Sequence, residues 1–291
     1  MAKQPRSISG KVAVVTGGGR GIGRATAQAL ARRGARVAIG DVDLATAERT
    51  AQELGGGMIA LALDVSDRPG FTAFLDEVER RLGPLDILVN NAGIMPIGPF
   101  EEEEDATVIR QLEINLHGVI HGTKEAVRRM RPRRTGHVVN LASVAGVAAI
   151  PGGATYCATK HGVVGLTEAV RLELRGTGVE VSYVCPGHVR TELTAGVEEN
   201  RSIPPITPEE VAEAIAGVIE VPRPRVFVPA TLKVPVTLTA LLPRRVGEGI
   251  SKLLKADRAL LDYDRKARAA YERRAAESAP AAEDVVAEHA A

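Results

Sequence analysis

The chain has 291 residues, of which 45% are hydrophobic and 25% are charged, as is ordinary for a globular protein. Lysine plus arginine number 37 against 36 for aspartate plus glutamate, and this balance gives no reason to expect nucleic acid as a partner. The two cysteines are too few for a disulfide framework, and the sequence starts without the apolar segment of a signal peptide. We therefore expect a cytoplasmic protein. The apolar run 234–243 is too short to span a bilayer, so at most residues 231–255 make a peripheral membrane contact.

Short β-branched runs alternate with longer amphipathic segments over the first 230 residues. The expected strands are 11–16, 36–41, 58–64, 86–91, 137–143, 179–185 and 225–229, and the expected helices are 22–33, 44–54, 67–82, 104–131, 155–175 and 208–220. The strands are almost continuously apolar, which indicates burial on both faces, as in a parallel sheet. We predict one Rossmann-type, doubly wound α/β domain over 1–230, with a mostly parallel seven-stranded sheet and helices on both faces.

The sequence changes character after residue 230. Residues 244–276 are rich in Arg, Lys and Ala, with helical spacing of Leu253, Leu260, Ala267 and Tyr271. We expect residues 231–276 to form a helical extension that either covers the substrate or makes a subunit interface. The tail 277–291 is not expected to pack.

The first predicted strand runs directly into a glycine-rich loop, TGGGRGIG (16–23). The Gly-x-Gly-x-x-Gly fingerprint is not met, but Gly17, Gly21 and Gly23 open a helix. Bare backbone amides at a helix N-terminus can approach a pyrophosphate. A plain glycine-rich turn is the alternative, and the position directly after the first strand favours a dinucleotide.

Asp41 ends the second predicted strand, 18 residues beyond Gly23. A carboxylate there can accept hydrogen bonds from the adenosine ribose hydroxyls and would repel a 2′-phosphate. Asp43 can cap the next helix, which leaves Asp41 free. Arg20 favours the opposite choice, because a guanidinium in the glycine loop can bind a phosphate. We give Asp41 more weight and expect NAD rather than NADP.

Three further residues are expected at the same crevice. Ser143 ends the fifth strand, 13 residues before Tyr156, and ligands of open α/β sheets bind at the carboxyl ends of strands. Tyr156 and Lys160 are four residues apart, so in a helix they share one face. The phenol is either a packed core residue or an acid–base group tuned by the ammonium.

The motifs Thr16–Gly23, Asn90–Gly93, Asn115, Ser143, Tyr156-x-x-x-Lys160 and Pro186-Gly187 occur in an ordered set. In this order and spacing, residues 8–230 resemble the short-chain dehydrogenase/reductase family. The resemblance implies that Tyr156 exchanges a proton with the substrate oxygen. It implies that Lys160 binds the nicotinamide ribose and lowers the phenol pKa, that Ser143 holds the substrate oxygen, and that Asn115 supports a proton-relay water.

The resemblance also implies the contacts of cofactor and substrate. The expected cofactor-binding residues are Gly17, Arg20, Gly21, Ile22, Gly23, Asp41, Asp64, Val65, Asn91, Ala92, Gly93, Tyr156, Lys160, Pro186, Gly187, Val189 and Thr191. The expected substrate contacts are Ser143, Tyr156, Ile94, Met95 and His188. No metal site is expected, because His117 and His121 share a helix face without a third ligand.

These features predict an NAD-dependent oxidoreductase that acts on a secondary alcohol or ketone. Nearly all of the expected pocket walls are apolar, so a steroid, terpenoid or lipid-derived alcohol is favoured. The alternatives are an NADP-dependent carbonyl reductase and a non-catalytic NAD-binding regulator, although a regulator would be expected to lose Ser143, Tyr156 or Lys160. The resemblance implies a homodimer or homotetramer.

Overall fold

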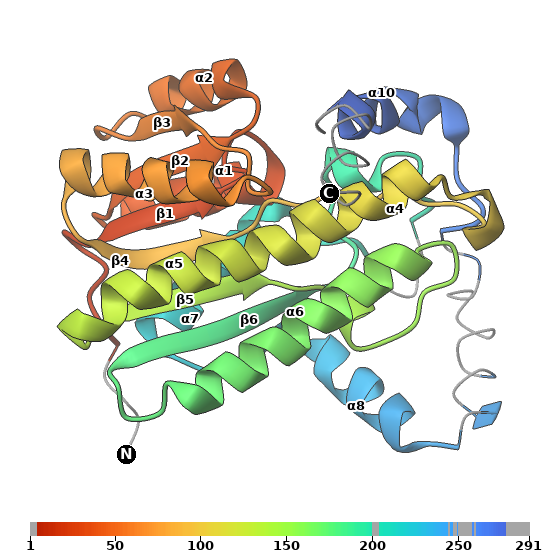
Figure 1. Cartoon of the computed structure of the whole chain (residues 1–291). Coiled ribbons are helices and arrows are strands. Elements are labelled where there is room, and N and C mark those ends of the chain that lie inside the picture. Colours follow the sequence, from red (N-terminus) through yellow and green to blue (C-terminus); the bar gives the residue numbers. More distant parts are fainter. Residues whose placement is uncertain are drawn as a thin grey trace, which may run out of the picture.

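Seven parallel strands form one sheet in the order β3-β2-β1-β4-β5-β6-β7 in the computed structural model (Figure 1). The structure describes residues 5–199, 204–243, 245, 246, 249, 258 and 260–277. The strands are β1 (Val12–Thr16), β2 (Arg36–Asp41), β3 (Ile59–Ala62), β4 (Leu85–Asn90), β5 (Gly136–Leu141), β6 (Val179–Pro186) and β7 (Arg225–Val228). This confirms the predicted doubly wound α/β fold.

Helices cover both faces of this sheet. One face carries α1 (Gly21–Arg32), α2 (Leu44–Leu54) and α7 (Pro208–Glu220), and the other carries α3 (Arg68–Leu82), α5 (Gly118–Arg133) and α6 (Ala154–Glu173). Alternate side chains of β1 enter opposite core clusters: Ala13 and Val15 pack on one face, and Val12 and Val14 on the other. Burial on both faces explains why the strands have apolar runs rather than alternating patterns.

The predicted helix 104–131 differs from the observed structure. It consists of α4 (Asp105–Leu112), a π-helical turn (Glu113–His117) and then α5. Single π turns within α-helices often occur at functional sites, and this one contains Asn115. Short 3₁₀ turns lie at Phe100–Glu102, Val144–Gly146, Glu192–Thr194 and Ala230–Leu232.

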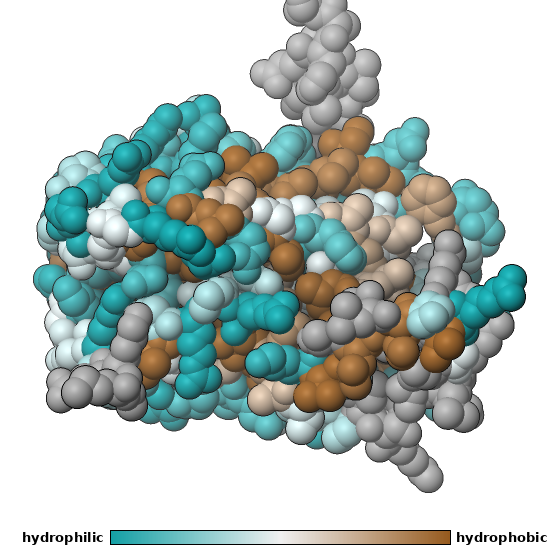
Figure 2. All heavy atoms as spheres, turned by 90° about the horizontal axis from the view of Figure 1, so that it is seen from below, coloured by the Kyte–Doolittle hydropathy of each residue, from teal (hydrophilic) through white to brown (hydrophobic). Residues whose placement is uncertain are grey.

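Among the described residues after the last strand, α8 (Lys233–Leu241) and α10 (Arg265–Glu277) are helices, so the extension is helical in these parts. Leu253 and the expected loose tail beyond Glu277 lie outside the described residues. Val234 and Leu238 of α8 are exposed, and Figure 2, seen from below, shows hydrophobic side chains between hydrophilic ones on that face. No helix within the described part of the chain has the length and apolar character to cross a membrane. The peripheral contact through 231–255 stays a prediction.

Candidate active site

The carboxyl ends of the central strands gather the predicted motifs at one edge of the sheet. The strand order reverses between β1 and β4, and such a reversal leaves a crevice in which ligands of open α/β sheets bind. The glycine loop follows β1, and the segment 91–93 follows β4. Ser143 follows β5, and Pro186 ends β6. The fold therefore brings motifs that lie up to 170 residues apart, from Gly17 to Gly187, to one place.

The loop between β1 and α1 has a backbone that side chains would obstruct. Gly17 and Gly21 have φ angles of +63° and +50°, in the left-handed region that favours glycine. A Cβ atom at Gly23 would lie 2.0 Å from the Gly17 carbonyl oxygen. The helix thus starts against bare backbone, which is the geometry that admits a pyrophosphate.

The N-terminus of α1 is available to an anion. Arg20 precedes the helix, and its side chain makes no capping hydrogen bond with any residue that the structure describes. The first turn of α1 contains no acidic residue, so its first N–H groups and the positive end of the helix dipole can receive an anion. Asn91 fixes the loop from β4, because its Nδ2 donates to the carbonyl oxygens of Thr16 (2.9 Å) and Gly17 (3.1 Å). These residues fit the diphosphate part of a dinucleotide.

Asp41 lies beside this loop, but its carboxylate is not free, which contradicts the expectation from the sequence. Its Oδ2 accepts a hydrogen bond from the Gly19 N–H at 2.9 Å, and its Oδ1 accepts from the Asp43 N–H at 3.1 Å. Each carboxylate oxygen can accept a second hydrogen bond, so Asp41 retains capacity for ribose hydroxyls. Asp43 caps α2 as predicted, accepting from the Thr46 N–H at 3.0 Å.

Arg20 turns away from the loop toward α2. Its Nη2 donates to Asp43 Oδ2 at 2.7 Å and to Thr46 Oγ1 at 2.9 Å. Hydrogen bonds from Thr46, followed by the one from Arg20, lower the pKa of Asp43. The ion pair is solvent-accessible on both sides, so it holds Arg20 only weakly.

Tyr156 and Lys160 lie together on the buried face of α6. Their exposed fractions are 8% and 4%. The Lys160 Nζ lies 5.6 Å from the centroid of the Tyr156 ring and donates to the carbonyl oxygen of Leu141, the last residue of β5, at 2.9 Å. An ammonium has three donors, so Lys160 keeps donors for a further acceptor beside the Leu141 carbonyl oxygen.

The pKa values of this pair differ from the expectation for Tyr156. Burial raises the pKa of Tyr156 to about 12, opposed by a hydrogen bond with Ser143 that lowers it. The same burial lowers the pKa of Lys160 to about 8. Desolvation disfavours the charged form of both groups, so the protein alone does not produce the predicted lowering at Tyr156. The positive charge of an oxidised nicotinamide, when bound nearby, would favour the phenolate and so act against the effect of burial.

Ser143 is held at the start of the turn Val144–Gly146. Its Oγ accepts a hydrogen bond from the Ala145 N–H at 3.1 Å. Ser143 also lowers the pKa of Tyr156, so the two side chains are neighbours. The pair can therefore address a single substrate oxygen.

The Asn115 side chain is buried and hydrogen-bonds to the segment after β4. Its Oδ1 accepts from the Ile94 N–H, and its Nδ2 donates to the Ile94 carbonyl oxygen, both at 2.8 Å. A Cβ atom at Gly93 would lie 3.1 Å from Asn115 Oδ1 and 3.7 Å from Lys160 Nζ. Asn115, Gly93 and Lys160 thus adjoin, while the role of Asn115 toward a relay water stays a prediction.

The cofactor residues predicted along β3 and α1 make contacts within the chain. Asp64 Oδ1 accepts from the N–H and the hydroxyl of Ser66 at 2.9 and 2.6 Å. Val65 is buried, and a Cβ at Gly118 would lie 2.7 Å from its side chain. Ile22 is partly buried and packs against the core cluster to which α1 contributes.

The residues predicted on β4 and β6 complete the edge. The Ala92 N–H donates to Thr16 Oγ1 at 3.0 Å, and the Gly187 N–H donates to the Val228 carbonyl oxygen at 2.8 Å. Val189 is buried beside Ile206. A Cβ at Gly21 would lie 3.4 Å from the Thr191 methyl group, so the segment after β6 reaches the glycine loop.

The apolar side of the site surrounds Tyr156. Met95, Ala145, Tyr156 and Cys157 form a buried cluster, against which the side chains of Ile97, Ile150 and Leu193 pack. Ile94, predicted as a substrate contact, packs in a different core cluster.

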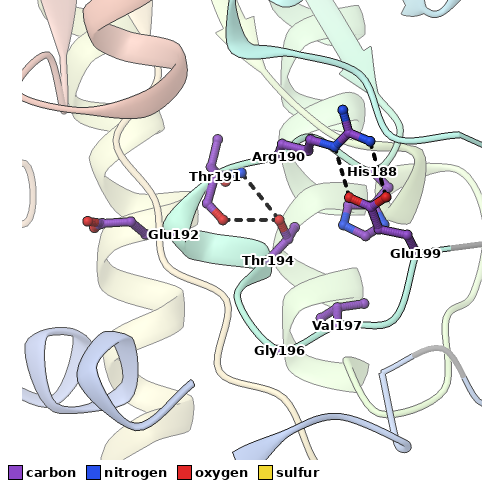
Figure 3. Close-up of a pocket in the computed structure, with 8 residues that line it drawn as sticks. All are labelled: His188, Arg190, Thr191, Glu192, Thr194, Gly196, Val197 and Glu199. Atoms are coloured by element: carbon purple, nitrogen blue, oxygen red, sulfur yellow. Dashed lines mark hydrogen bonds and ion pairs between the residues drawn. The ribbon is translucent and has the colours of Figure 1, made fainter. Parts of the chain in front are cut away.

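An open cavity of about 490 Å³ lies along the segment after β6 (Figure 3). His188, Thr191 and Val197 are among its lining residues, and Arg190 pairs with Glu199 at 2.8 Å across it. Burial lowers the pKa of His188, so its neutral form is favoured. The cavity is polar, in contrast to the cluster around Tyr156.

Two residues near the site were not predicted to belong to it. Arg268 and Tyr271 of α10 both hydrogen-bond to the main chain of Met95. Tyr271 was noticed only for its helical spacing. These contacts join residues that are more than 170 positions apart in the sequence, and no local sequence pattern predicts them.

No cluster of three metal-ligating side chains exists among the residues that the structure describes. His117 Nδ1 pairs with Glu113 at 3.0 Å, and His121 Nδ1 lies 3.2 Å from the Val65 carbonyl oxygen.

Known proteins resemble this chain over most of its length. A sequence model of the short chain dehydrogenase family matches residues 11–202. The "Probable oxidoreductase EphD" of Mycobacterium tuberculosis is 35% identical over 245 residues, 76% of this chain but only 41% of that protein, so the chain spans about two fifths of that relative. "Sorbitol dehydrogenase" of Cereibacter sphaeroides is 40% identical over 192 residues, 66% of this chain and 75% of that protein.

A solved structure shares the fold. The crystal structure of a short chain dehydrogenase/reductase from Burkholderia phymatum in complex with NAD matches with a TM-score of 0.75 and 29% identity. The match covers 81% of this chain and 94% of that one.

Proposed function

The chain belongs to the short-chain dehydrogenase family, a family of oxidoreductases, and we propose that it transfers a hydride between NAD and a secondary alcohol or ketone. One observation carries the proposal: Tyr156 lies near both Ser143 and Lys160, at the sheet edge that also holds the glycine loop. A non-catalytic nucleotide-binding protein has no need of this buried hydroxyl and ammonium, because burying them costs free energy.

The glycine loop and the uncapped start of α1 would hold the diphosphate, and Asp41 the adenosine ribose. Lys160 would donate to the ribose next to the nicotinamide. The solved relative that was crystallised with NAD supports NAD over NADP, as does the turning of Arg20 toward Asp43.

Side chains of the protein carry out the proton transfer to and from the substrate oxygen. In alcohol oxidation the Tyr156 phenolate takes the hydroxyl proton of the substrate, and the Ser143 hydroxyl donates a hydrogen bond to the same oxygen. The Lys160 ammonium favours the phenolate by its charge. NAD, when bound, supplies the acceptor for the hydride that leaves the carbinol carbon. In ketone reduction the Tyr156 phenol returns the proton to the oxygen.

For the substrate we propose a hydrophobic secondary alcohol of the steroid, terpenoid or lipid-derived class. The support is the apolar side chains of Met95, Ala145, Ile97 and Ile150, which pack around Tyr156. The polar cavity at His188 and the sorbitol dehydrogenase relative favour a polyol as the second candidate.

Steady-state kinetics of Tyr156→Phe test the chemistry. The variant keeps the ring and loses the acid–base group, so turnover should fall by at least about 100-fold while NAD still binds. Tyr183→Phe is the matched control, a buried tyrosine in β6 that packs with Phe227, and it should stay within a few-fold of the wild type. A Tyr156→Phe enzyme of nearly normal turnover would remove Tyr156 from the mechanism.

A panel of sterols, terpenols, acyl alcohols and polyols with purified protein tests the substrate class. The apolar alcohols should show the highest kcat/KM. A preference for sorbitol-like polyols over every apolar alcohol would overturn the substrate proposal and leave the hydride chemistry standing.

A further inference from the structure

The helix α10 lies at the carboxyl edge of the sheet, far in sequence from the strands it meets (Figure 1). Its Arg268 is a cation with 0% exposure, and Tyr271 is 9% exposed. A buried arginine is rare unless its donors are all engaged, so these two side chains have a definite structural task.

Arg268 binds main-chain carbonyls of two separate segments. Its Nη1 donates to the carbonyl oxygens of Leu193 (2.9 Å) and Ala195 (3.2 Å), in the turn after β6. Its Nη2 donates to the carbonyl oxygen of Met95, in the segment after β4. Its Nε donates to Glu272 of the same helix.

Tyr271 completes the contact with Met95. Its hydroxyl oxygen accepts from the Met95 N–H at 2.7 Å, so α10 engages both polar groups of that residue's main chain. The Arg268 guanidinium lies 4.7 Å from the centroid of the Tyr271 ring, within cation–π range. The two side chains thus act as one unit.

The two segments that α10 joins are walls of the apolar cluster at Tyr156. Met95 belongs to that cluster, and Leu193 packs against it. Figure 3 shows the Glu192–Thr194 turn beside the open cavity. Holding Met95 and Leu193 in place fixes the apolar surface that faces the Tyr156 ring.

The residues just before α10 also contact the loops around the site. The Asp264 N–H donates to the Gly196 carbonyl oxygen at 2.9 Å, and Val197 pairs with Tyr263. A Cβ at Gly152, just ahead of α6, would lie 2.6 Å from the Leu260 carbonyl oxygen. The segment 260–277 therefore packs on its own chain, against the loops that surround the site.

An anion-binding role for Arg268 does not fit these contacts. Of its five N–H groups, four are used by Glu272, Leu193, Ala195 and Met95, and none of its surface is exposed. The guanidinium is thus committed to the protein.

We propose that α10 is a cap over the substrate pocket, and that Arg268 and Tyr271 are positioning residues that set the pocket's size and its selectivity among alcohols. This rests on the proposed function. The cap acts through Met95 and Leu193 and leaves the Tyr156 chemistry and the nucleotide site untouched.

Arg268→Met and Tyr271→Phe test the cap, with Arg273→Met as the matched control on the exposed side of the same helix. KM and kcat are measured over alcohols of increasing size, and the dissociation constant of NAD is measured by titration without alcohol. Arg268→Met should raise KM for the preferred alcohol about 10-fold, because Met95, Leu193 and Ala195 lose their buried partner. The differences in kcat/KM among alcohols of different size should become smaller. The kcat and the NAD affinity should stay within about 3-fold of the wild type. Tyr271→Phe should show a smaller change of the same kind, and Arg273→Met none.

Hydrogen exchange of the free protein gives a readout that needs no activity. Exchange at 94–97 and 192–196 should become faster in Arg268→Met and Tyr271→Phe, and exchange in the glycine loop should not change. If Arg268→Met fails to fold, Tyr271→Phe decides. Unchanged exchange, or an equal loss of kcat for every alcohol with KM preserved, would overturn the cap even in an active dehydrogenase. An inactive wild-type protein would instead overturn the proposed function. In that case the hydrogen-exchange experiment alone would test the cap.

Discussion

Burial and charge act in opposite directions on the Tyr156 phenol. Its surroundings raise its pKa to about 12, and the same low-polarity environment lowers the pKa of Lys160 to about 8. Near neutral pH the phenol is therefore protonated and the ammonium is close to losing its proton. A positive charge beside the pair would favour the phenolate, which places the final tuning in the complete complex rather than in the protein alone.

Lys160 should make the protein more stable as pH rises above 8. Its folded pKa of about 8 lies below the unfolded value near 10.5, so the unfolded chain binds more protons between these values. The free energy of unfolding should therefore rise with pH in this window. Relative to Lys160→Met, the wild type should gain about 2 kcal/mol between pH 7.5 and 9.5.

Denaturant unfolding of both proteins across this pH range measures the difference, and subtraction removes the groups they share. Parallel curves for the two proteins would show that Lys160 keeps an ordinary pKa.

Asp41 should set the preference for NAD through its charge. Asp41→Asn keeps an acceptor for the Gly19 N–H and removes the charge that repels a 2′-phosphate. The ratio of kcat/KM with NAD to kcat/KM with NADP should therefore fall by about 10-fold or more. Asp41→Ala also removes the hydrogen bond to Gly19 and should weaken both nucleotides further. A wild type that prefers NADP would assign the choice to Arg20 instead.

At the scale of elements, local pattern predicted the sheet and most helices well. The β-branched runs gave strands close to their observed bounds, because burial on both faces requires apolar residues at consecutive positions. The break in the helix 104–131 was missed, since the π turn accompanies a pair of hydrogen bonds from Asn115 to Ile94, 21 residues away.

The site divides in the same way. Spacing within one helix predicted that Tyr156 and Lys160 would share a face, and strand ends predicted Ser143 beside them. Arg268 and Tyr271 escaped notice because their partner Met95 lies 173 and 176 residues earlier. Contacts of that range depend on how the extension folds back, which no periodicity encodes.

The close approach of α1 to the glycine loop should be sensitive to one methyl group. In Gly23→Ala the new Cβ would lie 2.0 Å from the Gly17 carbonyl oxygen, so the loop and the helix must separate. NAD affinity should fall at least about 10-fold, with a loss of stability of about 1–3 kcal/mol. Titration with NAD and thermal unfolding measure the two effects.

Gly217→Ala in α7 is the control, because its Cβ would meet nothing within 4 Å and alanine favours helix. Equal NAD affinity in Gly23→Ala and the wild type would show that the tight approach does not serve the nucleotide.

At the scale of the whole molecule, residues 260–277 are the part of the extension that packs against the loops around the site. Residues 260–277 contact the segments after β4 and β6 of their own chain. Of the two roles expected for 231–276, a substrate cover is favoured for this part. The outer surface of α6 then becomes the better candidate for contact with a second copy.

The exposed face of α6 carries small residues, including Ala158 and Gly165, and the half-exposed Leu172. Gly162 of the same helix instead admits Leu116 of its own chain, since a Cβ there would lie 2.9 Å from that side chain. Small exposed residues allow two helices to approach closely across a two-fold axis. We predict a dimer or tetramer that forms through this face.

Gly165→Arg should break that assembly without harming the protomer, because a Cβ at Gly165 would meet nothing within 4 Å among the described residues outside its own turn of helix. An arginine there would leave a charge buried against a partner helix, which disfavours association. Light scattering at micromolar concentration should show a dimer or tetramer for the wild type and a smaller species for the variant. Gln52→Arg on the exposed side of α2 is the control and should keep the wild-type mass. Because the substitution should not disturb the fold of one protomer, a lower mass with unchanged thermal unfolding assigns the interface to α6. A wild type that is already monomeric contradicts the prediction.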